Sequence, residues 1–320
     1  MISILCPCFN EEKSLPLFWE RITGVLDGNG EDYEFVFVND GSTDGTLSVM
    51  LRLAGLRVSV RVISLSRNFG KEAALSAAID YAAGDAVIPI DADLQDPPEL
   101  IPDMIAKWKE GYDVVLARRT DRKSDSFLKR WTAGCFYRLH NRISHPPLPE
   151  NVGDFRLMSR RVIDVVKLLP ERQRFMKGLF AWVGFDTAVI GYTRAERSAG
   201  KSSFNFFRLW KLAVEGITSF SALPLVIWSY LGGLISLAAF LYAGYIALRT
   251  LIYGVSVPGY ASTLCLILFL GGLQLLGIGV IGEYLSRTYM EAKGRPLYVV
   301  ADVFGPGGKR EESTENPLLR

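Results

Sequence analysis

The segment with the clearest chemical potential is Asp91-Ala92-Asp93-Leu94-Gln95-Asp96, which directly follows an apolar, strand-like run. A buried strand that ends in several carboxylates gathers oxygen ligands around one point, and hard divalent cations take such ligands. The spacing therefore predicts that Asp91 and Asp93 hold a divalent metal against a diphosphate. The alternative is a solvated acidic turn. We expect Asp96 to cap the helix that starts near Pro97-Pro98, because Asp is a favoured cap and proline a favoured first-turn residue.

Short apolar runs alternate with helix-like stretches before this turn and just after it. The expected strands are 2–8, 33–39, 60–65, 86–90 and 113–117, and the expected helices are 15–26, 45–54, 73–83 and 100–108. This alternation predicts an α/β fold with a doubly wound, mostly parallel sheet covered on both faces. Ligands of such sheets bind beyond the carboxyl ends of the strands, where the polar clusters 10–12, 39–44 and 91–96 all fall.

Residues 118–197 are more basic and less regular. The proline-rich break at 145–149 predicts a loop over the site. An amphipathic helix is expected at 160–169. The aromatic and aliphatic stretch 204–220 contains Arg208 and Lys211, and it predicts a helix that lies in a membrane interface rather than in a core.

Two apolar segments predict membrane-spanning helices at about 225–248 and 263–284, since each is long enough to cross a bilayer. The alternative is two buried helices of a globular core. Basic residues flank the pair on the outside, whereas only Arg249 lies in the connecting loop. By the positive-inside rule, both flanks face the cytoplasm. The chain is thus expected to be a multi-pass inner (plasma) membrane protein.

The predicted organisation has four parts: a cytoplasmic catalytic domain at 1–200, an interfacial region at 201–222, the two spans within 223–286, and a cytoplasmic segment at 287–320 whose tail from Gly305 is disordered. No signal peptide is expected at the amino terminus. The formal charge of +2 argues against nucleic acid as a partner. The four cysteines lack metal-ligand spacing, so we interpret them as small buried side chains.

Four ordered motifs resemble a known family. These are 7–12, 38–45, 91–98 and Gly153-Asp154-Phe155-Arg156. They are similar to the family 2 glycosyltransferases of GT-A fold, a Rossmann-like architecture. Within this family the chain most resembles the polyisoprenyl-phosphate glycosyltransferases, which include dolichyl-phosphate mannose synthase and the bactoprenol glucosyltransferases of the GtrB type. The likeness extends over about 300 residues from the amino terminus.

The resemblance implies an inverting enzyme that moves a hexose from a nucleotide sugar, UDP-glucose by preference, onto undecaprenyl phosphate in the membrane lipid at the cytoplasmic face. A flippase would take over the product. The resemblance also implies roles for individual residues. It assigns nucleotide contacts to Pro7, Asn10, Glu12, Asp40, Ser42 and Asp91. It assigns ligands of Mg²⁺ or Mn²⁺ to Asp91, Asp93 and Gln95. Helix capping is the alternative for Asn10 and the preferred role for Asp44.

The acceptor implied by the resemblance is a phosphate monoester, whose second pKa lies near 6, so it is already an anionic nucleophile at neutral pH. Such a reaction needs a cationic cradle more than a strong base. The expected cradle is Arg118, Arg130, Arg156, Arg197 and Lys201, with solvated surface charge as the alternative for each. Asp154 is expected to act as a general base, to orient the acceptor, or to orient Arg156. The family's R-x-x-G-x-S-K motif is altered here, because Ser203 stands in place of its lysine.

Three other functions stay open at the level of sequence. The same reaction could use another sugar, such as mannose from GDP-mannose or an aminoarabinose derivative. A processive polysaccharide synthase is disfavoured, because Gln173 is followed by Arg174-Phe175 rather than by a Q-x-x-R-W signature. A catalytically dead sugar-nucleotide sensor or membrane scaffold is disfavoured by the intact set Asp91, Asp93 and Gln95, because a scaffold does not need three metal ligands at a strand end. Gly232-Gly233 and Gly271-Gly272 would allow close packing of the spans in a homo-oligomer.

Overall fold

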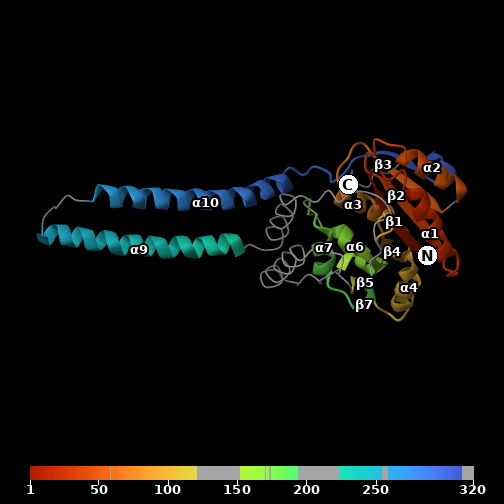
Figure 1. Cartoon of the computed structure of the whole chain (residues 1–320), viewed down its shortest axis with the longest axis horizontal. Coiled ribbons are helices and arrows are strands. Elements are labelled where there is room, and N and C mark those ends of the chain that lie inside the picture. The colour runs from red at the N-terminus through yellow and green to blue at the C-terminus, as the bar shows by residue number, and fades with distance from the viewer. Residues whose placement is uncertain are drawn as a thin grey trace. The chain divides into compact units, whose positions relative to one another are not determined.

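The computed structural model describes residues 1–57, 59–120, 152–169, 171–172, 174–193, 223–253 and 259–311. The chain forms two compact units (Figure 1). One unit comprises Met1–Ala213 together with Arg295–Arg320, and the other comprises Val214–Gly294. The second unit is thus inserted into the sequence of the first.

The first unit is built on a sheet of nine strands. The strands are β1 (Ile2–Cys8), β2 (Tyr33–Asn39), β3 (Val60–Leu65), β4 (Ala86–Pro89), β5 (Val114–Arg119), β6 (Val152–Ser159), β7 (Thr187–Tyr192), β8 (Val300–Phe304) and β9 (Arg310–Glu311). Their order in the sheet is β7-β5-β6-β4-β1-β2-β3-β8-β9. The five strands expected from the sequence are present within one or two residues of their predicted ends, which confirms the α/β class.

The expectation of a mostly parallel sheet is wrong, because the sheet is mixed. The central strands β4, β1, β2 and β3 are parallel to one another. However, β6 runs antiparallel between β4 and β5, and β8 runs antiparallel to β3. The prediction of parallel strands came from the regular alternation of strands and helices in the sequence. Both β6 and β8 lie outside the part of the chain that shows this alternation. Burial patterns identify a strand but carry no information on its direction.

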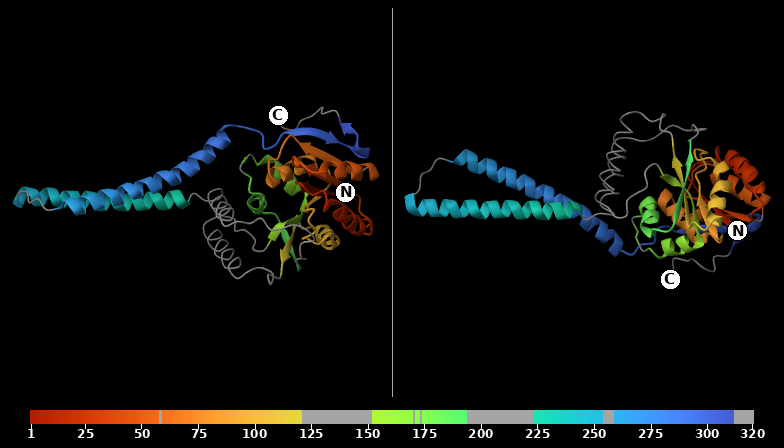
Figure 2. Two further views of the ribbon diagram at one scale, coloured as in Figure 1. Left: turned by 45° about the horizontal axis from the view of Figure 1, so that its top comes forward. Right: turned by 90° about the horizontal axis from the view of Figure 1, so that it is seen from below.

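Helices cover both faces of this sheet (Figure 2). One group consists of α1 (Leu15–Asp27), α2 (Thr46–Leu56) and α4 (Ile101–Lys109), the last preceded by the 3₁₀ turn η1 (Pro98–Leu100). The other group consists of α3 (Lys71–Tyr81), α6 (Arg160–Leu168) and α7 (Met176–Val183). A core cluster that includes Phe18, Phe35 and Phe37 joins the first group to the sheet. Burial of this apolar surface fixes the strand ends that carry the polar clusters.

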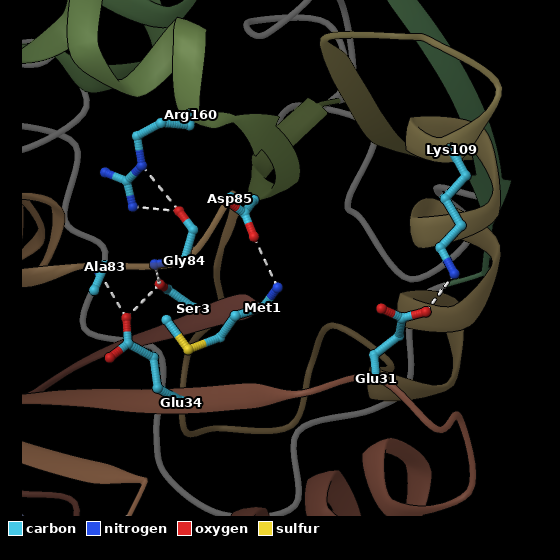
Figure 3. A network of polar contacts seen from close by, with 9 residues as sticks. All are labelled: Met1, Ser3, Glu31, Glu34, Ala83, Gly84, Asp85, Lys109 and Arg160. Atoms are coloured by element: carbon cyan, nitrogen blue, oxygen red, sulfur yellow. Dashed lines mark hydrogen bonds and ion pairs between the residues drawn. The ribbon is translucent and has the colours of Figure 1, made fainter.

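A polar network holds the opposite, amino-terminal end of the central strands (Figure 3). The hydroxyl of Ser3 accepts the N–H of Gly84 at 2.7 Å and donates to Glu34. Arg160 donates through Nε to the carbonyl of Gly84 at 2.9 Å. A Cβ atom at Gly84 would lie 2.6 Å from the Ser3 hydroxyl, so only glycine permits this approach. The loops at the other end of these strands are therefore built on a fixed base.

After the second unit, the chain returns to the sheet and does not become disordered at Gly305 as expected. Strand β8 pairs with β3, and the turn η2 (Pro306–Gly308) and strand β9 follow it. Tyr298 is fully buried, and its hydroxyl donates to Asp80 Oδ2 at 2.7 Å. The prediction of disorder from Gly305 is therefore wrong for residues 305–311. Residues 312–320 lie outside the described residues.

We predict that Tyr298→Phe destabilises the first unit by about 1.5 kcal/mol, because it removes a hydrogen bond to a charged acceptor. Thermal unfolding in detergent should show a midpoint about 3–6 °C lower than that of the wild type. The control is Tyr112→Phe at an exposed tyrosine, which should leave the midpoint unchanged. Equal unfolding midpoints for the wild type and Tyr298→Phe would show that the pairing of the carboxyl-terminal segment with the sheet does not depend on the hydrogen bond between Tyr298 and Asp80.

The second unit contains two long helices, α9 (Leu223–Tyr253) and α10 (Tyr260–Ala292), which contact each other. Gly277 lies against the indole of Trp228, and a larger residue at this position would require the indole to move. Within the described residues, one segment, Phe269–Ala292, is long and apolar enough to cross a membrane. Two spans therefore remain a prediction.

Candidate functional site

A cavity of about 270 Å³ lies at the carboxyl ends of the central strands. Its walls come from the ends of β1, β2 and β4 and from the turn between β3 and α3. The lining residues are Pro7, Cys8, Phe9, Glu11, Asp40, Asn68, Gly70, Lys71, Ala74, Asp91, Ala92 and Asp93. Of the residues that the sequence assigned to nucleotide or metal, this set brings together Pro7, Asp40, Asp91 and Asp93. Gln95 is buried and does not line the cavity.

Lys71, which the sequence did not single out, ties the cavity to the predicted catalytic aspartate. Its ammonium lies 2.7 Å from Asp91 Oδ2 and 2.8 Å from Asp154 Oδ2. Burial alone would lower the pKa of Lys71, but the charges of the two carboxylates outweigh this and raise it above its usual value. The lysine therefore stays cationic at neutral pH.

Asp154 is held as an anion. Burial would raise its pKa, but the ammonium groups of Lys71 and Lys177 dominate and lower it to about 2. Asp91 behaves differently: burial raises its pKa, although Lys71 acts in the opposite direction. A carboxylate with a pKa near 2 accepts protons poorly at neutral pH. This supports an orienting role for Asp154 over its role as a general base.

Asp40 is nearly inaccessible and shapes the turn that carries Lys71. Its Oδ1 accepts the N–H of Phe69 at 2.7 Å, and its Oδ2 accepts the N–H of Gly70 at 2.9 Å. Gly70 has φ +97°, a conformation that favours glycine. Because Asp40 also lines the cavity, it combines this structural task with a position where a base N–H could reach it.

The remaining predicted nucleotide contacts join the loops after β1 and β2. Asn10, with φ +57°, accepts the N–H of Thr43 at 2.9 Å and donates through its own backbone to Ser42 Oγ. Glu12 accepts the N–H of Gly45 at 3.1 Å. Asn10 is not a helix cap, since Ser14 is the N-cap residue of α1.

Two further capping predictions concern Asp44 and Asp96. Asp44 precedes Gly45, the N-cap residue of α2, and it accepts the N–H of Thr46 at 3.0 Å, so it satisfies one backbone donor at the start of that helix without being the cap residue itself. The cap predicted for Asp96 is wrong. The following turn has no side-chain cap, and the buried carboxylate of Asp96 instead accepts the hydroxyl of Tyr192 from β7. Tyr192 is far away in sequence, so only the folded sheet brings the two together.

The predicted cationic cradle is described only in part. Arg156 is buried, donates to the carbonyl of Gly153 at 2.7 Å and lies over the ring of Phe180, so the surface-charge alternative does not hold for it. Burial lowers its pKa to about 10, against the influence of Asp154. Arg118 is exposed near the carboxyl end of β5. Arg130, Arg197 and Lys201 lie outside the described residues, as does the interfacial region 201–222.

The acidic residues at the cavity fit a divalent metal. Burial raises the pKa of Glu11, and the charges of Asp93 and Asp91 raise it further, so these carboxylates repel one another. A cation would relieve this repulsion. In the part of the chain that the structure describes, no group of three His, Cys, Asp or Glu side chains is placed to hold a metal alone. Mg²⁺ is commonly bound by one or two carboxylates plus substrate phosphates and water, which suits Asp91 and Asp93.

Comparison with protein families decides the class of this chain. The model of glycosyl transferase family 2 matches residues 3–166, which include the cavity, the acidic turn and Asp154. The chain belongs to glycosyl transferase family 2. The resemblance found in the sequence is thereby confirmed, and the protein is a glycosyltransferase.

Relatives of this family 2 enzyme match over nearly its whole length. The prophage bactoprenol glucosyl transferase homolog of Escherichia coli K12 is 53% identical over 302 residues, covering 94% of this chain and 99% of the relative. The bactoprenol glucosyl transferase of Shigella phage SfV is 54% identical over 299 residues, covering 93% and 97%. The putative glycosyltransferase CsbB of Bacillus subtilis is 40% identical over 320 residues, covering 100% and 97%.

Solved structures are more distant from this glycosyltransferase. The glucosyl-3-phosphoglycerate synthase of Mycobacterium tuberculosis, in complex with Mn²⁺, UDP-glucose and phosphoglyceric acid, is 21% identical. The match covers 68% of this chain and 77% of that structure, with a TM-score of 0.46.

Glu72, a half-buried residue next to Lys71, is expected to make the stability of the family 2 enzyme depend on pH. Burial raises the pKa of Glu72 to about 7, and Asp154 adds to this effect, although Glu72 accepts the N–H of Met176. An unfolded glutamate has a pKa of about 4.3. The folded state thus binds more protons between these values, and stability falls as pH rises from about 4 to about 7.

We predict that Glu72→Gln, which stays neutral, has a higher unfolding midpoint than the wild type at pH 8. The difference should shrink towards pH 4.5, as measured by thermal unfolding in detergent across this range. The matched control is Glu20→Gln at an exposed position, which should leave the unfolding midpoint nearly unchanged at both pH 4.5 and pH 8. A constant difference between Glu72→Gln and wild type would contradict the raised pKa.

Proposed function

We propose that this enzyme transfers glucose from UDP-glucose to undecaprenyl phosphate, with inversion at the anomeric carbon. The observation that carries the proposal is the joining of Asp91 and Asp154 through Lys71 at one strand-end cavity. On one side of this pair, Asp91 and the neighbouring Asp93 offer the oxygen ligands that a metal bound to a nucleoside diphosphate requires. The names of relatives that are 53% and 54% identical over nearly their full length support glucose and bactoprenol as the substrates.

The proposed chemistry needs little proton transfer. An oxygen of the lipid phosphate attacks the anomeric carbon, the bond from that carbon to the nucleoside diphosphate breaks, and the electron pair leaves with the diphosphate. The nucleophile is already an anion at neutral pH. Asp154, whose pKa is about 2, therefore orients the reacting groups rather than removing a proton. Attack from the face opposite the leaving group gives a β-linked product.

Asp91 and Asp93 are the residues that would hold Mg²⁺ or Mn²⁺ in this proposal, with Gln95 as a further ligand if its buried side chain reorients. The metal, when bound, supplies Lewis-acid stabilisation of the departing diphosphate. Pro7, Asn10, Glu12, Asp40 and Ser42 would form the nucleotide pocket and its supporting loops. Arg118 and Arg156, with Arg130, Arg197 and Lys201, would bring the acceptor phosphate to the donor against charge repulsion.

We further propose that α9 and α10 are the two membrane spans and that the catalytic unit lies on the cytoplasmic side. The support is the length of both helices, the apolar segment Phe269–Ala292 and the basic flanks of the sequence. This arrangement suits an acceptor whose phosphate lies at the membrane surface. Homo-oligomerisation and handover of the product to a flippase are parts of the same proposal.

The test is a panel of labelled donors offered to the purified full-length enzyme with undecaprenyl phosphate in detergent. We expect lipid-extractable label from UDP-glucose, little from GDP-mannose or UDP-N-acetylglucosamine, and a β-anomer in the product. Label from GDP-mannose alone would retain the reaction but replace the sugar. An α-anomer would contradict the single inverting step.

A further inference from the structure

Lys71 is the first residue of α3, and it bridges two carboxylates that come from different strands. Its Nζ lies 2.7 Å from Asp91 Oδ2 and 2.8 Å from Asp154 Oδ2. Asp91 follows β4, and Asp154 belongs to β6, which pairs with β4. One ammonium group therefore connects the proposed metal and donor side of the site with its proposed acceptor side.

The position of this lysine is determined by its neighbours on both sides. The two residues before it, Phe69 and Gly70, donate their backbone N–H groups to Asp40. The residue after it, Glu72, accepts the N–H of Met176 at the start of α7. These contacts fix the backbone at Lys71, and the two ion pairs hold its partly exposed ammonium.

Lys71 is also the only basic residue among those that line the described cavity, whose acidic members are Glu11, Asp40, Asp91 and Asp93. A metal bound to Asp91 would lie close to an ammonium that already contacts the same carboxylate. Like charges at such a distance repel each other, and the Lys71 and Asp91 side chains, which are 45% and 36% exposed, are only partly screened by water. Metal and ammonium therefore compete for Asp91. A nucleoside diphosphate adds negative charge and reduces this conflict.

We propose, on the basis of the metal site in the proposed function, that Lys71 is a built-in counter-ion that competes with the divalent metal for Asp91. When the metal binds, Lys71 gives up Asp91 and keeps its ion pair with Asp154. Its freed N–H then donates to an oxygen of the nucleoside diphosphate. The metal alone consequently binds weakly. Bound nucleotide increases the affinity of the protein for the metal, and bound metal increases its affinity for the nucleotide. In this scheme Lys71 holds Asp91 and Asp154 in position while the metal is absent, and it contacts the nucleoside diphosphate once the metal is bound.

Titration of Mn²⁺ into the full-length protein in detergent, with free Mn²⁺ measured by electron paramagnetic resonance, tests this competition. An opposite charge in contact lowers the proton affinity of a carboxylate by about 10- to 1000-fold, and we take the lower end of this range for a metal ion. We therefore expect Lys71→Met to bind Mn²⁺ in the absence of nucleotide about tenfold more tightly than the wild type. UDP should strengthen Mn²⁺ binding strongly in the wild type and much less in Lys71→Met.

Two further variants separate the contact from general electrostatics and from folding. Lys177→Met removes another positive charge that acts on Asp154, this time from α7, and should change Mn²⁺ affinity by about twofold or less. Lys71→Arg retains the charge and should bind Mn²⁺ as weakly as the wild type. Circular dichroism checks that each variant is folded.

The competition is overturned if wild type binds Mn²⁺ and Lys71→Met shows no gain, or if Lys177→Met shows the same gain. In both cases the proposed function is untouched. If neither the wild type nor Lys71→Met binds Mn²⁺ even with UDP present, the metal site of the proposed function is wrong, and the role of Lys71 falls with it.

Discussion

Replacing Asp93 with alanine should lower the rate of sugar transfer by at least about 10²-fold, while the protein remains folded. Asp93 lines the cavity beside Asp91, and its Oδ1 accepts the N–H of Gln95 at 3.1 Å. The variant removes one of the two carboxylates proposed to hold the metal. Without the metal, charge that develops on the departing diphosphate lacks its main stabilisation. The rate is measured as lipid-extractable label from the nucleotide sugar.

The matched control is Glu99→Gln, which removes one acidic charge shortly after the same turn. Glu99 is exposed and pairs with Arg21 at 2.7 Å. Surface ion pairs of this kind contribute little, so this variant should keep nearly full activity. An active Asp93→Ala enzyme would rule out the proposed metal site, and equal losses in both variants would point to a general effect of charge on the turn.

Replacing Asp154 with asparagine should lower kcat by about 10²-fold without changing the shape of the pH profile between pH 6 and 8. The ion pair with Lys71 is lost, so both the lysine and the acceptor side of the site lose their fixed position. The pKa of Asp154 is about 2, so its carboxylate does not titrate in this range. The rate and its pH dependence are measured under saturating donor.

Asp164→Asn is the control for this experiment, since Asp164 is an exposed residue of α6 that pairs only at 4.0 Å with Arg160. It should have no effect on kcat. If Asp154→Asn instead loses a limb of the pH profile that the wild type has near pH 6, Asp154 is a general base, and the orienting role assigned to it is incorrect.

Periodicity predicted the strand ends well for a physical reason. The central strands are buried on both faces, so each apolar run in the sequence begins where the strand enters the core and ends where it leaves the core. Residues 2–8, 33–39 and 60–65 are the clearest cases. The directions of β6 and β8 could not be obtained in this way. The direction of each of these strands depends on its position in the sheet. That position is determined by contacts between residues that are distant in the sequence.

The same distinction applies to the site. Asp91 and Asp93 are recognisable because they follow a strand directly, and they do line the cavity. Lys71 is separated from Asp154 by more than 80 residues of sequence, and only the packing of α3 against the sheet brings them together. A clue was present in the polar residues after the third strand, Ser66 to Asn68, whose strand-end position matches the other polar clusters. Asp96 was misassigned because its partner, Tyr192, is equally remote.

The return of the chain to the sheet after α10 had a weak signal in the sequence. The stretch Tyr298 to Phe304 is apolar except for Asp302. The predicted disorder began only after this stretch, at Gly305, where glycine, proline and charged residues dominate. The ordered residues 306–311 are held by pairing of β9 with β8, and Tyr298 helps to anchor the start of this segment through its buried ring and its hydrogen bond to Asp80.

The most direct test of the whole account is transfer of labelled glucose from UDP-glucose to undecaprenyl phosphate by the full-length enzyme, with Mg²⁺ and with EDTA in parallel. We predict labelled lipid with Mg²⁺, none with EDTA, and recovery when Mg²⁺ is restored. Equal labelling in EDTA would contradict a metal at Asp91 and Asp93, and no labelling from UDP-glucose under any of these conditions would contradict the proposed reaction.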